Sequence, residues 1–401
     1  MARQLKKSEQ ITPTLSVVYD YDQKLTKTAE FESAFRNALG DIEVIKHGRN
    51  HKVYKYSHDN HDTYFLTGAI TWLSGPHPLF KKRLQLKEWY REVYDEYDHM
   101  ENTDVRIVGV YRYDGMHIFV EFNIEDYKDN KLNSSSAHVY SNDLYQALTN
   151  DYFTKIDQKG NRITTISSRN FKKYIDGDAV EKSLFDLFEE FNNGFSFGEW
   201  ITAVSAIEKM KSKRWYQWKG TEWAGWFLEY EMNEFIEKEQ CHDTIVYIGN
   251  KKTEDLLDFD LYFKNDDFYG DLKASDITKK LAPGNDQNTT LEAINHNGKL
   301  WYIIYEHETK KDTDYNNEMA KARMELIGTP YEEGSKISYR TRMKHSVNFK
   351  KMEILELNRI NMHEILRTFN QGRNSDGNER NVKFIIDKKN IDNFTVFSYH
   401  V

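Results

Sequence analysis

Cysteine and proline are scarce in this chain, which has 401 residues, one cysteine and five prolines. The single cysteine, Cys241, excludes an intramolecular disulfide framework and a cysteine-rich zinc site. No apolar run approaches the ~18 residues that a membrane-spanning helix needs, and the N-terminal segment lacks the apolar stretch of a signal peptide. From these absences we expect a protein of the reducing cytoplasm that does not associate with membranes.

A strongly basic half or tail is also missing. The net charge is -8, and residues 1–200 carry 26 basic and 31 acidic side chains, against 30 and 33 in residues 201–401. This balance excludes a non-specific polyelectrolyte binder, but it permits DNA binding through local basic patches. The glycine-rich P-loop motif is absent as well, so we do not expect ATP-driven translocation.

Aromatic side chains make up 14% of the chain, which predicts a globular protein because disordered chains lack them. The length of 401 residues predicts two or three domains, at roughly 100–200 residues each. We expect an N-terminal α+β region over residues 1–195 and a second region over residues 196–401, with the boundary near Gly194 and Gly198. The order of the expected elements predicts an α/β (mixed α+β) fold class.

Periodicity and turn signals place the expected elements. Asp114-Gly115 lies between two alternating apolar runs, which is the pattern of a β-hairpin. Apolar residues at helical spacing predict helices. The expected helices are 80–97, 179–193, 199–213 and 220–240. The expected strands are 62–70, 105–113, 116–122, 244–248, 256–263, 268–273 and 300–307.

The most informative segment is 256–275, because it contains two expected strands joined by a polar turn. In the first strand, Asp258 and Asp260 face the same way, and in the second strand Asp271 and Lys273 share a face. A hairpin can therefore bring Asp258 or Asp260 close to Asp271 and Lys273. Two carboxylates beside an ammonium group suit Mg²⁺, which proteins usually hold through one or two carboxylates plus phosphate and water.

This pattern of an acid followed on a neighbouring strand by the triplet Asp271-Leu272-Lys273 resembles the PD-(D/E)XK nuclease superfamily. Neither candidate first acid follows a proline, and the triplet has Asp in place of the commoner Glu. Asp260 is the better match to the first acid, and Asp258 is the alternative. The resemblance covers about residues 215–310. It implies a restriction-endonuclease-like core in the C-terminal region, with a central mixed sheet flanked by helices.

The resemblance also implies roles for individual residues. Asp260 and Asp271 would bind Mg²⁺, and Lys273 would serve the attacking water. A glutamate on the preceding helix would assist. Glu229 is the best match, with Glu222 and Glu234 as rivals. The implied activity is Mg²⁺-dependent cleavage of double-stranded DNA, as in a homodimeric type II restriction enzyme. The alternatives are a repair or recombination nuclease of the same superfamily and a non-catalytic DNA-binding protein with a degenerate core.

Basic clusters give the candidate DNA contacts. One cluster lies at the expected start of the helix 80–97. A second lies in residues 336–351, where no acid occurs between Glu333 and Glu353. Lysine and arginine in such clusters contact phosphates. The residues predicted to contact DNA are Lys81, Lys82, Arg83, Arg340, Arg342 and Lys344.

Overall fold

The computed structural model describes residues 6–48, 51–127, 135–150, 152–157, 159–177, 184–249, 256–338, 341–369 and 381–400. The chain divides into two compact units, Met1–Glu181 and Lys182–Val401. Both units contain mixed sheets and helices, so the predicted mixed α+β fold class is confirmed. The predicted boundary at residues 195/196 lies at the end of a helix that packs within the second unit, as described below. No described helix is both long and apolar enough to cross a membrane.

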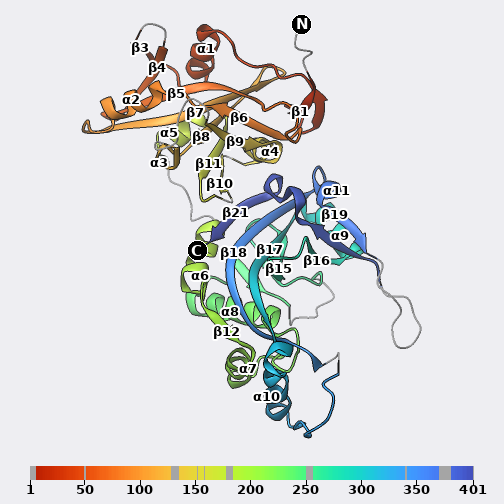
Figure 1. Ribbon diagram of the computed structural model, residues 1–401. Coiled ribbons are helices and arrows are strands. Elements are labelled where there is room, and N and C mark those ends of the chain that lie inside the picture. The colour runs from red at the N-terminus through yellow and green to blue at the C-terminus, as the bar shows by residue number, and fades with distance from the viewer. Residues whose placement is uncertain are drawn as a thin grey trace. The chain divides into compact units, whose positions relative to one another are not determined.

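The first unit is built on a sheet with the strand order β10-β11-β8-β7-β5-β4-β3, from which β6 and β9 branch beside β5, and β1 and β2 form a separate hairpin (Figure 1). Its strands are β1 (Ser8–Ile11), β2 (Val17–Asp20), β3 (Glu43–His47), β4 (His51–His58), β5 (His61–Trp72), β6 (Lys81–Gln85), β7 (Thr103–Tyr113), β8 (Met116–Phe122), β9 (Ser136–Tyr140), β10 (Tyr152–Ile156) and β11 (Arg162–Ser167). Its helices are α1 (Thr28–Leu39), α2 (Trp89–Tyr97), α3 (Ile124–Tyr127), α4 (Ser141–Thr149) and α5 (Phe171–Ile175).

Apolar side chains from both faces of this sheet are buried, because helices cover each face. Phe35 of α1 and Phe171 of α5 pack with Phe65, Val108 and Phe119 of the sheet. On the other face, side chains of α2 and α4 pack with alternate strand residues. They include Tyr90, Val93, Leu144, Ala147, Leu66, Ile107, Tyr111 and Val120. Burial on both faces explains why consecutive side chains are buried in β5 (63–66), β7 (107–111) and β8 (118–120).

The hairpin about Asp114-Gly115 is confirmed, since β7 pairs antiparallel with β8 and Tyr113 lies opposite Met116. The helix predicted over 80–97 is wrong in its first part. Residues Lys81–Gln85 form strand β6, with alternating half-buried and buried side chains, and only Trp89–Tyr97 is helical. The alternation along β6 has period two, and pairing with β5 and β9 outweighs the helical spacing.

The second unit is built on a sheet with the strand order β12-β18-β17-β15-β14-β13, and β21 also pairs with β18; β16, β20 and β19 form a smaller sheet. Its strands are β12 (Trp200–Thr202), β13 (Ile245–Tyr247), β14 (Leu261–Phe263), β15 (Phe268–Asp276), β16 (Leu281–Asp286), β17 (Lys299–Lys311), β18 (Lys344–Asn358), β19 (Leu366–Phe369), β20 (Lys383–Asp387) and β21 (Thr395–His400). Its helices are α6 (Leu184–Gly194), α7 (Ala203–Ser212), α8 (Trp223–Glu239), α9 (Gln287–Asn297), α10 (Glu318–Leu326), α11 (Met362–Ile365), and the 3-10 helices η1 (Asp312–Tyr315) and η3 (Lys388–Asn393).

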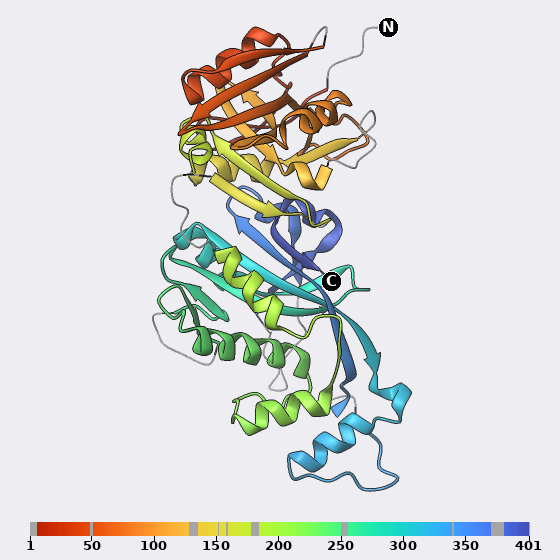
Figure 2. The same ribbon diagram turned by 90° about the vertical axis from the view of Figure 1, so that its left-hand side faces the viewer.

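This sheet is mixed, because β15 runs parallel to β17 whereas β14 and β18 pair antiparallel with their neighbours. Helix α6 packs on one face, where Phe185 stacks on Trp301 at 5.4 Å between ring centroids. Helix α9 and the smaller sheet cover the other face, where Ala293 and Ile386 share a core with Tyr302. Figures 1 and 2 show these elements on the two sides of the β15–β17–β18 strands.

Several predicted elements of this unit are confirmed with different ends. The helix predicted over 220–240 is α8, and the strands predicted at 244–248, 268–273 and 300–307 are β13, β15 and β17. The strand predicted over 256–263 is wrong in its first half, since β14 begins at Leu261. The helix predicted over 199–213 begins at Ala203, after strand β12.

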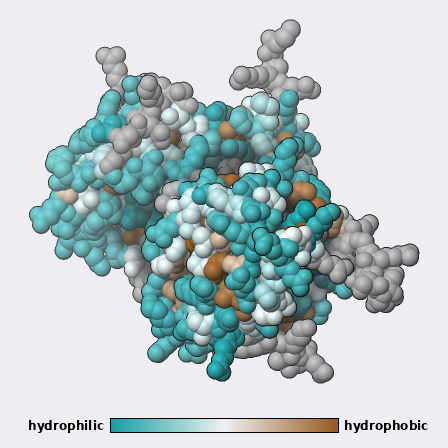
Figure 3. Space-filling view, turned by 60° about the horizontal axis from the view of Figure 1, so that its bottom comes forward, coloured by the Kyte–Doolittle hydropathy of each residue, from teal (hydrophilic) through white to brown (hydrophobic). Residues whose placement is uncertain are grey.

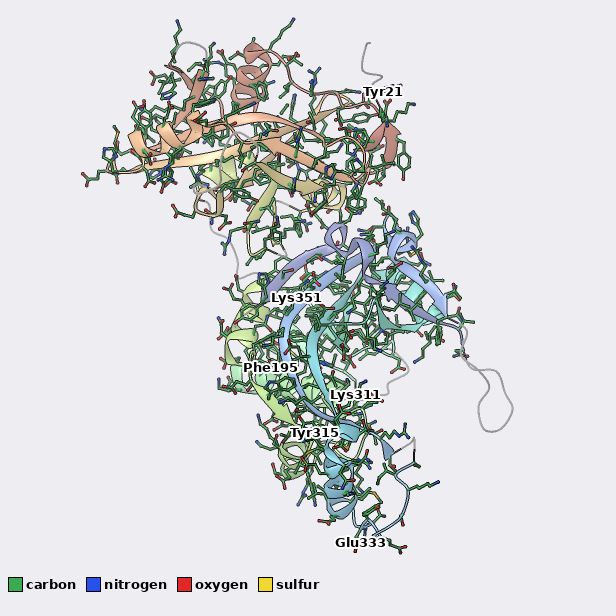
Figure 4. The ribbon with its side chains drawn as sticks, viewed as in Figure 1. Tyr21, Phe195, Lys311, Tyr315, Glu333 and Lys351 are labelled. Atoms are coloured by element: carbon green, nitrogen blue, oxygen red, sulfur yellow. The ribbon has the colours of Figure 1, made fainter. Side chains whose placement is uncertain are left out.

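Strands β17 and β18 continue beyond β15, and there β12 pairs with the other edge of β18. Lys311 lies where β17 ends, Tyr315 follows in η1, and Glu333 lies in the segment between α10 and β18 (Figure 4). Tyr315 stacks on His345 of β18 at 4.1 Å, which ties η1 to the strand. The face shown in Figure 3 is mainly hydrophilic, with hydrophobic side chains in small separate patches.

Candidate functional site

Strand β15 carries two of the predicted site residues on one face. Asp271 and Lys273 are two residues apart, and Leu272 between them is buried on the opposite face. The Lys273 ammonium group forms an ion pair with Oδ2 of Asp271. Because Asp271 is only 2% exposed, this pairing offsets the cost of burying its charge.

Asp260 lies directly before β14, and the β14–β15 hairpin brings it to Asp271 and Lys273. Its Oδ2 accepts a hydrogen bond of 2.9 Å from the backbone N–H of Leu272. Burial and the charges of Asp271 and Glu229 raise the pKa of Asp260 well above its ordinary value. Burial alone would lower the pKa of Lys273, but the charges of Asp271 and Asp260 raise it.

Asp258, the alternative first acid, has a different environment. Its side chain is exposed, and residues 256–260 are not part of a strand, so the two acids do not share a strand face as the alternation predicted. Of the two candidates, Asp260 is the one whose carboxylate lies with Asp271 and Lys273.

Helix α8 contributes Glu229, which is 7% exposed. Its Oε2 accepts a 2.6 Å hydrogen bond from the hydroxyl of Tyr247, and the Tyr216 hydroxyl lies 3.0 Å from that of Tyr247. Burial raises the pKa of Glu229 to about 7 against the effect of the Tyr247 hydrogen bond, and the charge of Asp271 adds to the increase. Of the rivals, Glu222 is exposed and Glu234 is paired with Lys213, so neither takes this place. We call Glu229, Asp260, Asp271 and Lys273 the carboxylate site.

Asn285, at the end of β16, is a member of this environment that the sequence did not indicate. Its Nδ2 donates a 2.9 Å hydrogen bond to Oδ1 of Asp271, and its backbone N–H donates to the Tyr302 hydroxyl at 3.2 Å. Its Oδ1 is buried and has no hydrogen-bond partner among the described residues. This amide oxygen is a further oxygen atom at the site of the kind that Mg²⁺ binds.

The donor set of the carboxylate site fits Mg²⁺. Among the described residues, no group of three or more His, Cys, Asp and Glu side chains is placed to hold a metal ion. The two carboxylates that the β14–β15 hairpin brings together, Asp260 and Asp271, match in number the one or two that usually hold Mg²⁺ when phosphate and water complete the shell. Burial, and after it the charges of Asp271 and Glu229, raise the pKa of Asp260, and a bound cation would favour its charged form.

Gly249 gives a test of how closely the site is packed. A Cβ atom at this position would lie 2.5 Å from the Tyr247 hydroxyl oxygen and 3.1 Å from Oδ1 of Asp260. We expect Gly249→Ala to lower the free energy of unfolding by about 1–3 kcal/mol, because an added methyl group in a packed region forces neighbours to move. Urea unfolding followed by circular dichroism measures this change.

Gly225 in α8 is the matched control, since nothing lies within 4 Å of a Cβ built there. Gly225→Ala should leave the free energy of unfolding unchanged or raise it by up to about 1 kcal/mol, because alanine is the better helix former. Equal effects of the two substitutions would contradict the close approach of Tyr247 and Asp260 to Gly249.

Comparison with known protein families gives a match in the first unit. Residues 61–175 match the model of a protein family described as Methylase-associated X1. This Methylase-associated X1 segment runs from β5 to α5 and does not include the carboxylate site. No curated protein and no solved structure matches the chain.

The first basic cluster lies within the Methylase-associated X1 segment, on β6. Lys82 is fully buried, and its Nζ lies 3.1 Å from Oδ1 of Asp22. The predicted DNA contact by Lys82 does not fit this placement, because the alternation of β6 turns its side chain inward. Lys81 and Arg83 are half-buried, on the other face of the strand.

The second basic cluster is only partly described. Arg340 lies outside the described residues, and Arg342 is exposed. Lys344 is half-buried at the start of β18, where its Nζ donates to Nε2 of His307 at 3.2 Å. Burial lowers the pKa of Lys344. Of the three residues predicted to contact DNA in this cluster, Arg342 is the one that is both described and exposed.

His307 gives a pH-dependent prediction. It is fully buried in β17, and burial lowers its pKa from 6.5 to about 4, with the charge of Lys344 acting in the same direction. As the pH falls from 6.5 towards 4, the unfolded chain binds a proton that the folded chain does not bind. Stability is therefore lost on acidification through this window, by about 2 kcal/mol at pH 5 relative to pH 7.5.

Urea unfolding of the wild type and of His307→Gln at both pH values isolates this contribution, since the other titrating groups are common to both proteins. We expect the fall in stability to be smaller in His307→Gln by that amount. The same pH dependence in both proteins would contradict a neutral, buried His307.

Proposed function

We propose that the protein is a Mg²⁺-dependent endodeoxyribonuclease of the PD-(D/E)XK type, which hydrolyses phosphodiester bonds of double-stranded DNA. The observation that carries this proposal is the convergence of Asp260, Asp271 and Lys273 beside Glu229, at a hairpin of a mixed sheet. A surface hairpin with unrelated charges would leave these side chains in solvent, whereas Asp271 and Glu229 are buried. Burial raises the pKa values of Glu229 and Asp260, and acids with pKa values raised in this way mark candidate functional sites.

Each side chain has a role that its environment supports. Asp260 and Asp271 would hold Mg²⁺, which when bound would lower the pKa of a water molecule and stabilise negative charge on the phosphate. The Lys273 ammonium group would orient the attacking water and offset negative charge at the phosphate. With a pKa of about 7, Glu229 can take up or release a proton near neutral pH. Water would add its oxygen to phosphorus, one P–O ester bond would break, and the leaving oxygen would take a proton.

The family match supports a restriction–modification context for this activity. The family is described as methylase-associated. The Methylase-associated X1 segment lies in the first unit, whereas the carboxylate site lies in the second. We infer that this unit takes part in DNA recognition and that the second unit cleaves, as in a type II restriction enzyme. A homodimer would match the two-fold symmetry of palindromic sites.

Incubation of the full chain with plasmid DNA tests the proposal. We expect discrete fragments with Mg²⁺ and none with a chelator in its place. Products that depend on DNA branches or ends rather than on sequence would favour a repair or recombination nuclease of the same superfamily. DNA binding without any Mg²⁺-dependent product would leave a non-catalytic DNA-binding protein and would contradict the proposal.

A further inference from the structure

The first unit contains a cavity of about 690 Å³ that lies outside the carboxylate site. It is bounded by the start of α1, the β3–β4 hairpin, β5 and the N-terminal end of α2. Its volume falls within the range of small-molecule and cofactor sites. The part formed by β5 and α2 belongs to the Methylase-associated X1 segment.

Aromatic rings form one wall of this cavity. Trp89 stacks on His51, with 4.7 Å between ring centroids and 13° between planes, and His47 lies 5.9 Å from the same indole. His47 and His51 are directly opposite each other on β3 and β4, so their rings lie on one face of the hairpin. We call Trp89, His47 and His51 the aromatic platform.

The aromatic platform is held by a buried contact of Trp89 and by an exposed contact of His47. Tyr90 is 2% exposed, packs edge-on against Trp89 at 4.7 Å, and donates a 2.7 Å hydrogen bond to the carbonyl of Thr67. His47 is fixed by Glu92, whose carboxylate lies 3.3 Å from Nε2 of His47. A platform fixed in this way loses little conformational entropy when a ligand binds.

Charges at the cavity define the class of ligand. Lys52, half-buried on β4, and Lys87, exposed before α2, provide ammonium groups, while Glu88 and Glu92 provide carboxylates. A flat heteroaromatic base can stack on the platform, exocyclic amino groups can donate to the carboxylates, and a phosphate can pair with the lysines. These groups together match a nucleotide.

We propose that this cavity binds a single nucleotide, with its base on the aromatic platform and its phosphate at Lys52 and Lys87. The choice of a nucleic-acid ligand rests on the proposed function. The nucleotide can come from solution, as a free deoxynucleoside monophosphate, or from DNA, as an unpaired nucleotide extruded from the duplex. Extrusion costs only a few kcal/mol when the base is already unpaired.

The experiment uses the full chain with Asp271→Asn, so that binding is measured without cleavage. One arm titrates each of the four deoxynucleoside monophosphates by calorimetry. The other arm compares a duplex that contains one bulged nucleotide with the same duplex without the bulge. Each arm is run with Trp89→Ala, Trp89→Phe and Lys52→Ala, and with Trp200→Ala, an exposed tryptophan of the second unit, as the matched control.

We expect Trp89→Ala to weaken binding of the nucleotide or of the bulged duplex by roughly 10–100-fold, which is the usual effect of losing one base-stacking partner. Trp89→Phe should retain most of the affinity, and Lys52→Ala should lower it and reduce its dependence on salt. Weakening in the first arm identifies a free nucleotide, and weakening confined to the bulged duplex identifies DNA.

Unchanged binding of both probes in Trp89→Ala and Lys52→Ala, or no binding of either probe to the parent chain, would overturn the proposal. If Trp89→Ala fails to fold, Lys52→Ala still decides, since it is expected to lower the affinity. Because binding is measured apart from cleavage, a protein that cuts DNA but binds neither probe would contradict this inference alone. A protein that binds a nucleotide but cuts no DNA would contradict the proposed function instead.

Discussion

Asp271→Asn is expected to reduce the rate of Mg²⁺-dependent DNA cleavage by roughly 10³-fold, which corresponds to several kcal/mol of lost transition-state stabilisation. The substitution keeps the shape of the side chain, and Asn285 can still donate to the remaining oxygen. It removes one of the two carboxylate charges that would hold Mg²⁺ and the partner of Lys273. Initial rates of plasmid cleavage at saturating Mg²⁺, with folding checked by circular dichroism, give the effect.

Asp258→Asn is the matched control for this prediction. It removes the same charge two residues before Asp260, from an exposed side chain. We expect cleavage within about twofold of the wild type, because an exposed carboxylate interacts weakly with a buried site across solvent. Asp260→Asn should behave like Asp271→Asn. Loss of activity in Asp258→Asn with full activity in Asp260→Asn would reverse the assignment of the first acid.

Lys273→Ala is expected to lower cleavage by about 10²–10⁴-fold, the usual range for the loss of a group that transfers or orients a proton. It should also destabilise the fold, because Asp271 is then buried without its ion-pair partner, at a cost of about 3–5 kcal/mol. Cleavage rates and urea unfolding curves of the same preparation separate the two effects.

The double variant Lys273→Ala/Asp271→Asn further separates the effect on the cleavage rate from the effect on the free energy of unfolding. Without the buried carboxylate charge, the double variant should regain part of the free energy of unfolding but no activity. Lys279→Ala, which removes an exposed lysine shortly after β15, should change neither quantity. Recovery of cleavage in the double variant would show that neither Lys273 nor the charge of Asp271 takes part in the chemistry.

The local elements of this fold were predictable where one pattern dominates. Asp114-Gly115 between apolar runs gave the β7–β8 hairpin, and the wide apolar stripe of residues 220–240 gave α8. Residues 80–88 were mispredicted because Lys82 and Leu84 alternate with half-buried neighbours while the spacing also suits a helix. Residues 81–85 form a strand because they pair with β5 and β9, which are distant in sequence.

The carboxylate site was predictable in part for the same reason. Asp271 and Lys273 share a strand, so period-two alternation alone places them on one face. Tyr247 and Asn285 were missed, since single polar residues carry no periodic signal and only the assembled sheet brings them to Glu229 and Asp271. The inward side chain of Lys82 was missed because a run of basic residues reads as a solvated surface.

Cleavage of DNA in water enriched in ¹⁸O tests the central claim most directly. The wild type and Asp271→Asn, prepared in parallel, are incubated with Mg²⁺ and one linear duplex, and the terminal phosphates of the products are examined by mass spectrometry. The account predicts one ¹⁸O atom in each new phosphate end from the wild type and almost no product from Asp271→Asn. Absence of product from the wild type, or labelled product from both proteins at equal rates, would contradict it.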